Sequence, residues 1–384
     1  MPDRTMPPYR IVILGGDPMG RAIAAKLAAD SRYRPVVADT HDEGLRDAEA
    51  DGLETLHLDG HFRESVGRAL AGTTAVVCTE TKLNLSDVVT LAQERGCHYI
   101  DISENPATAR EIAKRATDAS CVVPACGLAP GYVTALTGEM LAGCDRQTEL
   151  EVRVGVLPAH RTNRLGYGKM WSLGGLIAEY TAPCLAIRDG RITELRPLQE
   201  LEEIALAGEQ FEAFTTAGTL DGLIHRYDGQ VGNLIFKTLR YPGHLDYVRF
   251  LLDDLGLSER LYQLHNLLMN GLPAISEDRV IISMILRRGP GARPEHFLQM
   301  ISARQDGDGQ WQSAVSVATA AHAACVVDIA CTGLAPHRGL LDHGELTPGL
   351  LRESPFFAPL STAPAASALP NGTEIHEGQQ SLQR

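Results

Sequence analysis

The sequence lacks the patterns that would place the protein in a cysteine-rich or strongly basic class. Its eight cysteines are scattered and contain no CxxC pair, which argues against a zinc site or a disulfide framework and indicates small core residues in a reducing compartment. No long run of lysine and arginine is present, and the net charge is −13. Nucleic acid and anionic membrane surfaces are therefore poor partners, and we expect no metal ion.

Uninterrupted apolar runs are also missing. Residues 1–9 contain prolines and no apolar signal core. The most apolar late run, residues 314–330, is broken by hydroxyl, imidazole and carboxylate side chains, which indicates a buried helix and not a membrane span. Apolar residues still make up 44% of 384 residues, enough for a packed core and for two domains. The composition predicts a soluble, cytoplasmic protein.

The chain opens with a strand, a glycine-rich turn and a helix, the parts of a dinucleotide-binding βαβ unit. Apolar residues 11–14 lead into Gly15-Gly16-Asp17-Pro18-Met19-Gly20, and the alanine-rich residues 22–29 follow. The helix N-terminus can hold a pyrophosphate because its first N–H groups lack partners and its dipole end is positive. Asp39 stands about twenty residues beyond the glycines, where its carboxylate can accept hydrogen bonds from ribose hydroxyls and would repel a 2′-phosphate. This placement predicts NAD in preference to NADP.

One position departs from the G-x-G-x-x-G pattern. The second required glycine, where the backbone approaches the pyrophosphate most closely, is Asp17. A carboxylate there repels the ligand unless its side chain turns away or Gly16 takes over the contact. Two hypotheses follow: the unit binds NAD, or the fold is retained and the nucleotide has been lost.

From residue 10 to about residue 125, short apolar strands alternate with helices, which predicts a parallel sheet with helices on both faces. Ligands of such sheets lie outside the carboxyl ends of the strands, where we expect Thr79 and Asp101. Asp101 is either a catalytic or positioning group or a cap for the helix that begins near Asn105. The loop Cys126-Gly-Leu-Ala-Pro-Gly131 either brings backbone close to a ligand or changes the chain direction between domains.

Beyond residue 149, alternating polar and apolar residues are typical of half-buried antiparallel strands. One strand ends in Arg240-Tyr-Pro-Gly-His244, a turn that presents an imidazole. Arginine is suited to bidentate capture of a carboxylate, and histidine exchanges protons near neutral pH. The alternative is that the cations of this strand are solvated surface. The helix at residues 314–330 is expected to return to the first domain, and the chain after Pro355 is expected to be disordered.

Five motifs follow one another along the chain: His98-Tyr-Ile-Asp-Ile-Ser103, Gly127-Leu-Ala-Pro-Gly131, Trp171-Ser-Leu-Gly-Gly-Leu176 with Tyr180-Thr-Ala-Pro183, Ala213-Phe-Thr-Thr-Ala-Gly218, and Lys237-Thr-Leu-Arg-Tyr-Pro-Gly-His244. In this order they resemble the saccharopine dehydrogenase family, and most closely its short members, the lysine 6-dehydrogenases. The likeness runs from about residue 10 to residue 350.

The fold class expected from the pattern and the resemblance is α/β, with an N-terminal Rossmann domain and a second α/β domain with a mixed sheet. The expected boundaries are a Rossmann NAD-binding domain at residues 8–131, a substrate-binding and dimerisation domain at residues 132–313, a helical return to the Rossmann domain at residues 314–352, and a disordered tail at residues 353–384.

The resemblance implies that a homodimer oxidises an amine-bearing carbon of lysine, or of a lysine-like amino acid, with NAD. The donor carbon must be positioned, a base must take a proton from the ammonium, and a cation must hold the substrate's carboxylate. By position Arg240 would be the carboxylate anchor, with support from Thr216 and Tyr167. Asp101 and His244 are the acid–base candidates. His244 favours the lysine enzymes, because the saccharopine enzymes tend to have an aromatic residue there.

Two further departures leave the substrate open. Cys78-Thr79-Glu80 stands where the family often has an amide-bearing residue, and Lys169 stands where the lysine enzymes have a histidine. A cation at that point suits a second acidic group of the substrate and disfavours a free ε-ammonium. The alternatives are a saccharopine-type secondary-amine dehydrogenase and a non-catalytic homologue. The cofactor contacts we expect are Gly15, Gly16, Met19, Gly20, Asp39, Thr79 and Gly131, and the substrate contacts are Arg240, Tyr167, Thr216 and Lys169.

Overall fold

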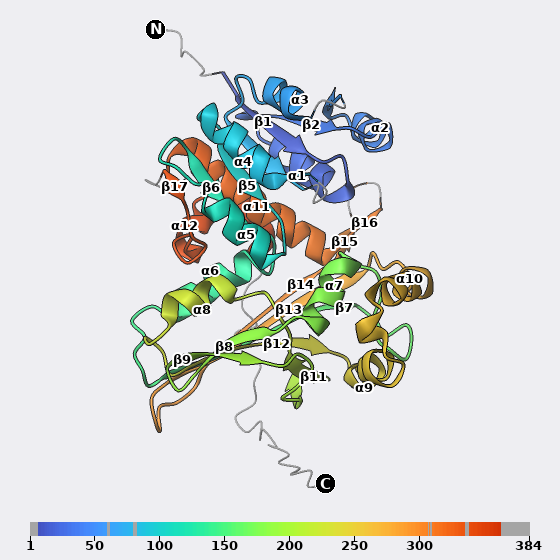
Figure 1. Cartoon of the computed structure of the whole chain (residues 1–384), viewed down its shortest axis with the longest axis vertical. Coiled ribbons are helices and arrows are strands. Elements are labelled where there is room, and N and C mark those ends of the chain that lie inside the picture. The colour runs from blue at the N-terminus through green and yellow to red at the C-terminus, as the bar shows by residue number, and fades with distance from the viewer. Residues whose placement is uncertain are drawn as a thin grey trace. The chain divides into compact units, whose positions relative to one another are not determined.

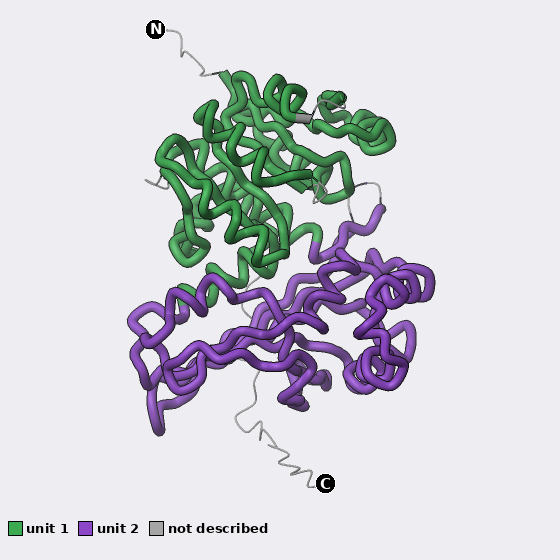
Figure 2. Tube along the Cα trace, in the orientation of Figure 1, with its two compact units in different colours: residues 1–139, 316–361 green, residues 140–315, 362–384 purple. Residues whose placement is uncertain are grey.

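A computed structural model of the chain describes residues 7–59, 62–79, 83–305, 307, 309–334 and 338–361. The described chain forms two compact units (Figure 2). Unit 1 contains the residues up to 139 together with residues 316–361, and unit 2 contains residues 140–315. The first boundary falls eight residues later than we expected, inside the helix Tyr132–Met140. This helix packs with unit 1, where the ring of Tyr132 lies against His322 and Phe357.

Unit 1 is built on the parallel sheet that the alternation predicted (Figure 1). Its strand order is β17-β6-β5-β4-β1-β2-β3, and every neighbouring pair is parallel. The strands are β1 Tyr9–Leu14, β2 Tyr33–Asp39, β3 Glu54–His57, β4 Ala75–Cys78, β5 His98–Asp101, β6 Cys121–Val123 and β17 Gly339–Leu340. The order reverses between β1 and β4, and the carboxyl ends of strands at such a switch point form the ligand crevice.

The helices of unit 1 follow the strands in sequence. The described elements are α1 Pro18–Ala28, α2 Asp42–Ala50, α3 Phe62–Ala69, α4 Leu85–Glu94, α5 Pro106–Ala113, α6 Tyr132–Met140, α11 Ala314–Thr332, α12 Pro348–Arg352 and the 3-10 helix η3 Pro355–Leu360. Helix α11 is long and apolar enough to cross a membrane, with a mean hydropathy of 1.7, but 89% of its apolar window is buried inside the protein. It is a core helix, as its interrupting polar residues predicted.

The expected helical return at residues 314–352 also contains a strand. Strand β17 adds to the edge of the sheet beside β6, with Gly339 opposite Cys121. The amide of Gly339 donates to the carbonyl of Ser120 at 2.9 Å, and the amide of Leu341, just after the strand, donates to the carbonyl of Val122 at 3.0 Å. A strand of two residues is too short to show alternating polar and apolar positions in the sequence. The pairing is therefore seen only in the folded structure, where β17 lies beside the edge strand β6.

The prediction of a disordered tail is wrong for its first residues. Helix η3 buries Phe356, Phe357 and Leu360. The ring of Phe356 packs edge-on against Tyr33, with 5.6 Å between centroids. These three apolar side chains give the segment a packed face despite its prolines. The remainder of the expected tail, residues 362–384, lies outside the described residues.

Unit 2 is built on an eight-stranded mixed sheet with the order β10-β11-β12-β7-β13-β14, and the β8–β9 hairpin joins it at β12. Strands β7 and β12 are parallel and the other pairs are antiparallel. The strands are β7 Thr148–Pro158, β8 Cys184–Arg188, β9 Arg191–Leu195, β10 Glu202–Leu206, β11 Glu209–Thr215, β12 Asn233–Arg240, β13 Asp278–Arg288 and β14 Glu295–Ser302, with a separate pair, β15 Arg304–Gln305 and β16 Trp311–Gln312. The helices are α7 Leu173–Thr181, α8 Asp221–Tyr227, α9 His244–Arg249 and α10 Leu261–Gly271, with the π-helix η1 Phe250–Asp254 and the 3-10 helix η2 Leu257–Glu259.

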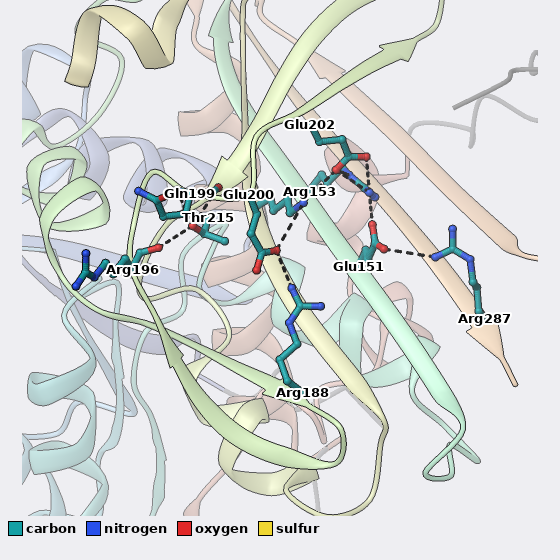
Figure 3. Close-up of polar contacts among 10 residues, drawn as sticks. Glu151, Arg153, Arg188, Arg196, Gln199, Glu200, Glu202, Thr215 and Arg287 are labelled. Atoms are coloured by element: carbon teal, nitrogen blue, oxygen red, sulfur yellow. Dashed lines mark hydrogen bonds and ion pairs between the residues drawn. The ribbon is translucent and has the colours of Figure 1, made fainter. Parts of the chain in front are cut away.

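The two faces of this sheet differ in chemistry. On one face Phe214 packs into an apolar cluster with α7, α9 and α10. The other face carries the apolar cluster around Leu157 and Leu239, and beside it a row of alternating charges crosses the strands. Figure 3 shows that Arg153 of β7 and Glu202 of β10 point toward one another, and their atoms approach to 2.7 Å. Because successive side chains of a strand point to opposite faces of the sheet, the Leu157–Leu239 cluster and the row of charges lie on the same face.

Candidate active site

The glycine turn of unit 1 has the close packing of a dinucleotide fingerprint. Gly15 has φ 128°, which a residue with a side chain rarely adopts. A Cβ on Gly20 would lie 2.1 Å from the carbonyl oxygen of Gly15 and 2.9 Å from the hydroxyl of Thr79. The first and third glycines are therefore required, because α1 lies directly against the ends of β1 and β4.

Asp17 turns its side chain back onto the helix. It is the N-cap of α1, and its Oδ1 accepts a hydrogen bond from the Gly20 amide at 2.7 Å. The first three residues of α1 are Pro18, Met19 and Gly20. Pro18 has no N–H and the amide of Gly20 bonds to Asp17, so the amide of Met19 is the one of these three that can meet a phosphate. Of the two ways in which the turn could accommodate this carboxylate, the structure shows the first. Its negative charge stays at the helix N-terminus.

Gly16 is held from two sides. Its amide donates to Oδ2 of Asp39 at 2.7 Å. A Cβ on Gly16 would lie 2.8 Å from the backbone of Gly44 in α2, so both positions need glycine. The closeness of Gly16 to α2 was not predicted, since the two glycines are far apart in the sequence.

Asp39 is the carboxylate at the end of β2. Its Oδ1 accepts a hydrogen bond from the His41 amide at 2.9 Å, and the Asp39 side chain is 10% exposed. Burial favours the neutral acid, but the N–H groups of Gly16 and His41 outweigh it and lower the pKa of Asp39. An ionised carboxylate with spare lone pairs suits ribose hydroxyls, so the turn and Asp39 together fit a dinucleotide.

Asp101 ties the end of β5 to the glycine loop. Its Oδ1 accepts from the amides of Ser103 (2.8 Å) and Ala125 (3.2 Å), and its carbonyl accepts from Cys126 at 2.6 Å. The side chain is fully buried, and burial raises the pKa of Asp101 despite these bonds. Asn105, not Asp101, caps α5 through a 2.9 Å bond to Ala107, which excludes the alternative that Asp101 is the helix cap.

Two buried histidines also contact the backbone of this loop. The Nε2 atom of His343 donates to the carbonyl of Pro124 at 2.7 Å, and Nδ1 of His322 lies 3.3 Å from the carbonyl of Cys126. Burial lowers the pKa of His322 to about 3 and also lowers that of His343, so both rings are neutral. Gly131 closes the loop with φ 124°, where a Cβ would lie 2.1 Å from the oxygen of Gly127.

In unit 2, Arg240 is a fixed internal cation. Its side chain is 2% exposed. The Nε atom donates to the Tyr180 hydroxyl at 2.8 Å, and Nη1 donates to Thr238 Oγ1 at 2.7 Å and to the Leu239 carbonyl at 2.9 Å. The guanidinium lies 4.8 Å from the ring centroid of Tyr167. This burial excludes the alternative of a solvated surface cation. Nη2 remains as the part of Arg240 that can meet a carboxylate.

His244 continues this hydrogen-bond chain. Its Nδ1 lies 2.8 Å from the carbonyl of Leu165 and therefore donates, so Nε2 accepts from the Tyr180 hydroxyl at 2.9 Å. Burial and the charge of Arg240 lower the pKa of His244 to about 3, and the residue is 1% exposed. Both nitrogens are engaged, and the neutral ring positions Tyr180.

A buried carboxylate fixes the turn that carries His244. Glu212 of β11 accepts hydrogen bonds from the amides of Gly243 (2.9 Å) and Leu245 (2.5 Å). Gly243 has φ 88°, so this turn requires glycine. Glu212 is a positioning residue that the sequence did not reveal, because β11 lies far from residue 244 in the chain.

Glu179 meets the free side of Arg240. Its Oε2 lies 3.4 Å from Arg240 Nη2, and its side chain is 19% exposed. Burial raises the pKa of Glu179 to about 7, and Arg240 opposes that rise. A carboxyl group that titrates near neutrality beside a fixed cation can exchange a proton with a ligand.

Two family models match the chain. The saccharopine dehydrogenase NADP binding domain matches residues 11–123, and the saccharopine dehydrogenase C-terminal domain matches residues 127–361. The chain belongs to the saccharopine dehydrogenase family. Family members are oxidoreductases that act on CH–NH donors and bind a nicotinamide dinucleotide.

Solved structures are similar in fold. The apo saccharopine dehydrogenase (L-Glu forming) from Saccharomyces cerevisiae aligns with a TM-score of 0.73 at 16% identity, over 92% of this chain and 97% of that one. GenD2 from gentamicin A biosynthesis, in complex with NAD, aligns with a TM-score of 0.43 at 12% identity, over 92% and 94%. A myo-inositol dehydrogenase from Corynebacterium glutamicum aligns with a TM-score of 0.40 at 14% identity, over 90% and 95%. The first of these confirms the two-domain α/β fold class of the saccharopine dehydrogenase family.

Within this family fold, the structure gathers some of the predicted substrate contacts and separates others. Arg240, Tyr167 and His244 share one cluster, in which Tyr167 (1% exposed) lies against Arg240. Thr216 is 2% exposed, and its hydroxyl has no hydrogen-bond partner among the described residues. Lys169 is not part of this cluster: its Nζ donates a hydrogen bond to the carbonyl of Met269 at 2.9 Å.

Sequence reasoning missed Tyr180 as the link between Arg240 and His244, and it missed Glu179. The signal was present: Tyr180 opens the second half of a family motif, and Glu179 stands just before it. On a helix, adjacent residues point in different directions, so only the packing of α7 against β12 shows that both reach Arg240.

Proposed function

We propose that the protein is an NAD-dependent oxidoreductase that oxidises the amine-bearing carbon of lysine or of a lysine-like amino acid. The observation that carries the proposal is Arg240, a buried cation with Nε and Nη1 bound internally and Nη2 turned to a single carboxylate. Such a cation is suited to anchoring the carboxylate of an amino acid. Membership of the saccharopine dehydrogenase family supports the reaction class.

The residues of this chain would divide the work as follows. Gly15, Gly20, Asp39 and Thr79 would hold the dinucleotide, whose oxidised nicotinamide supplies the hydride acceptor. Arg240 would bind the carboxylate and orient the substrate, with Tyr180 and Tyr167 keeping the guanidinium in place. A base must take one proton from the ammonium before hydride can leave, because only a neutral amine has the lone pair that forms the C=N bond.

NAD is proposed in preference to NADP on the strength of Asp39. Its ionised carboxylate lies at the end of β2 and would repel a 2′-phosphate. The family model that matches this region is named for NADP, so the two cofactors must be compared directly.

The test combines binding and turnover. The purified protein is titrated with NADH and with NADPH while nicotinamide fluorescence is followed. NAD and a panel of amino acids are then added, and absorbance reports reduction. Tighter binding of NADH, followed by turnover of L-lysine but not of saccharopine, is the expected result. If neither dinucleotide binds, Asp17 has closed the site and the protein is a non-catalytic homologue.

A saccharopine-type secondary-amine dehydrogenase is the second candidate. Lys169 favours it through the resemblance alone, which puts residue 169 beside the substrate pocket, where a cation would suit a substrate with a further acidic group. Against it, the ammonium of Lys169 is already hydrogen-bonded to the Met269 carbonyl. Turnover of saccharopine alone in the same panel would select this candidate.

We also propose that the protein is a homodimer formed through the charged face of the unit 2 sheet. Leu298 and Met300 lie only partly buried beside the apolar cluster of that face, next to the row of charges in Figure 3. Partly accessible apolar side chains bordered by charged residues fit the apolar centre and polar rim of an interface. Light scattering after gel filtration should give twice the chain mass of 41.5 kDa. A monomer at micromolar concentration would contradict the proposal.

A further inference from the structure

Glu179 and Arg240 form an ion pair whose two side chains differ in exposure to solvent. Arg240 is 2% exposed and Glu179 is 19% exposed, so a ligand can reach the carboxylate more easily than most of the guanidinium. The separation of Oε2 and Nη2 is 3.4 Å, which is long for a charge-assisted hydrogen bond. Glu179 therefore rests beside Arg240 without a tight bond to it.

The remaining donors of Arg240 are committed. Nε bonds to Tyr180, and Nη1 bonds to Thr238 and to the Leu239 carbonyl, all within 2.9 Å. These partners lie on rigid elements, since Thr238 and Leu239 belong to β12 and Tyr180 belongs to α7. A substrate carboxylate must therefore use Nη2, the atom that Glu179 now faces.

Two opposing effects act on the Glu179 carboxylate. Burial favours the neutral acid, and the positive charge of Arg240 favours the carboxylate. Tyr180 and Cys184 also interact electrostatically with Glu179. Burial raises the pKa of both of these groups, so both stay neutral near pH 7. Arg240 is therefore the charge that limits the rise in the pKa of Glu179 to about 7.

A substrate carboxylate on Nη2 would cancel this charge. With the pull of Arg240 neutralised, burial alone would act on Glu179, and its affinity for a proton would rise. The proton that Glu179 then accepts comes from the ammonium on the carbon that is to be oxidised. Binding of the substrate's carboxylate to Arg240 thus makes Glu179 a stronger base for the proton of the substrate's ammonium.

We propose that Glu179 is the base of the amine oxidation and that the substrate's own carboxylate activates it by neutralising Arg240. This inference rests on the proposed function. The ammonium passes one proton to a carboxylate oxygen of Glu179, which leaves a neutral amine and a neutral carboxylic acid. The nitrogen lone pair then forms the C=N bond as the C–H bond breaks, and the hydride with its electron pair passes to oxidised nicotinamide.

The first experiment measures proton uptake without turnover. Hexanoate, which has the carboxylate and carbon chain of lysine but neither of its ammonium groups, is titrated into the protein by calorimetry at pH 7 in phosphate and in Tris. The dependence of the heat on the buffer gives the number of protons bound. We expect uptake approaching about half a proton for the native chain and none for Glu179→Gln. Glu111→Gln, at an exposed carboxylate of α5, is the matched control and should behave as the native chain.

The second experiment measures kcat and KM against pH with the amine that the panel identifies. Glu179→Gln is expected to lower kcat by about 10²–10⁴-fold and to remove the acidic limb of the kcat profile, with KM changed by only a few-fold. Turnover by the native chain together with an unchanged profile in Glu179→Gln would overturn the assignment and leave the proposed function standing. Absence of turnover in the native chain would overturn the proposed function itself.

Hexanoate binding without proton uptake in the native chain would also overturn the inference. Failure of hexanoate to bind, with Arg240 in place, would contradict the role of Arg240 as the carboxylate anchor, on which the inference depends. Circular dichroism of Glu179→Gln separates a folding defect from loss of the base. If that variant does not fold, Glu179→Asp, which keeps the charge but shortens the reach, should lower kcat while proton uptake persists.

Discussion

The hydroxyl of Tyr180 donates to Nε2 of His244 across 2.9 Å and accepts a hydrogen bond from Nε of Arg240 at 2.8 Å. The direction of every proton in this chain is fixed, because the Leu165 carbonyl at Nδ1 can only accept. His244 therefore acts on the substrate anchor through Tyr180.

We predict that His244→Ala mainly raises KM. The substitution leaves the Tyr180 hydroxyl without its acceptor and releases Arg240 from one of its supports, at a cost of about 1–3 kcal/mol. Steady-state kinetics over a range of substrate concentrations checks this. A lowered kcat with an unchanged KM would instead favour the acid–base role that the sequence suggested for His244.

Stability should fall as the pH is lowered through the ordinary histidine range. Burial lowers the pKa of His244 and of His322 to about 3, below the ordinary value of 6.5. The unfolded chain therefore binds protons that the folded chain does not, so the stabilisation is complete above pH 6.5 and is lost progressively as the pH falls toward 3. Each histidine should contribute about 2 kcal/mol of this loss between pH 7 and pH 5. Urea unfolding at the two pH values, with His322→Gln as a variant of reduced pH dependence, measures it.

Asp17→Gly should tighten dinucleotide binding. The change removes a negative charge from the N-terminus of α1 and restores the glycine pattern, while a glycine cap costs the helix only a few tenths of a kcal/mol. Fluorescence titration with NADH should give a lower Kd, and the gain should shrink as salt is added, because salt screens the lost repulsion. An unchanged Kd at low salt would show that the Asp17 carboxylate does not face the pyrophosphate.

Glu202→Gln should destabilise unit 2 by about 2–4 kcal/mol, because it leaves the guanidinium of Arg153 buried with one carboxylate fewer. Arg153 is 2% exposed and Glu202 is 17% exposed. Glu200 of the same row is 37% exposed, so Glu200→Gln is a matched control with an expected change below about 1 kcal/mol. Urea unfolding measures the free energy of unfolding of both variants. Equal decreases in Glu202→Gln and Glu200→Gln would contradict the larger contribution of the buried Arg153–Glu202 pair.

Asp101→Asn is expected to lower kcat with little effect on carboxylate binding. Both hydrogen bonds go to Oδ1, so the amide oxygen of Asn can keep the link between β5 and the loop at residues 124–131, and the variant removes the ionisable carboxyl group alone. NADH fluorescence and steady-state kinetics together test this. An unaltered kcat in the folded variant would remove Asp101 from the acid–base candidates.

Local chemistry determined much of this protein from its sequence. The apolar run Ile11–Leu14 followed by a glycine turn permits only a buried strand that leads into a helix, and the strand–helix alternation that follows permits only a parallel sheet. Arg240 and His244 were also found, because the short turn between them keeps them near one another whatever the remainder of the chain does. The distance between residues only four positions apart is limited by the chain itself, so it can be predicted from the sequence.

Tertiary structure decided what these groups can do. Glu179, Tyr180 and Glu212 lie on α7 and β11, and only the packing of these elements against β12 and α9 brings them to Arg240 and His244. Burial then set the protonation of each group, leaving His244 neutral and bringing Glu179 near neutrality. Desolvation depends on everything that surrounds a side chain. Residue type therefore predicted Asp101 and His244 as the acid–base candidates, whereas the folded environment favours Glu179.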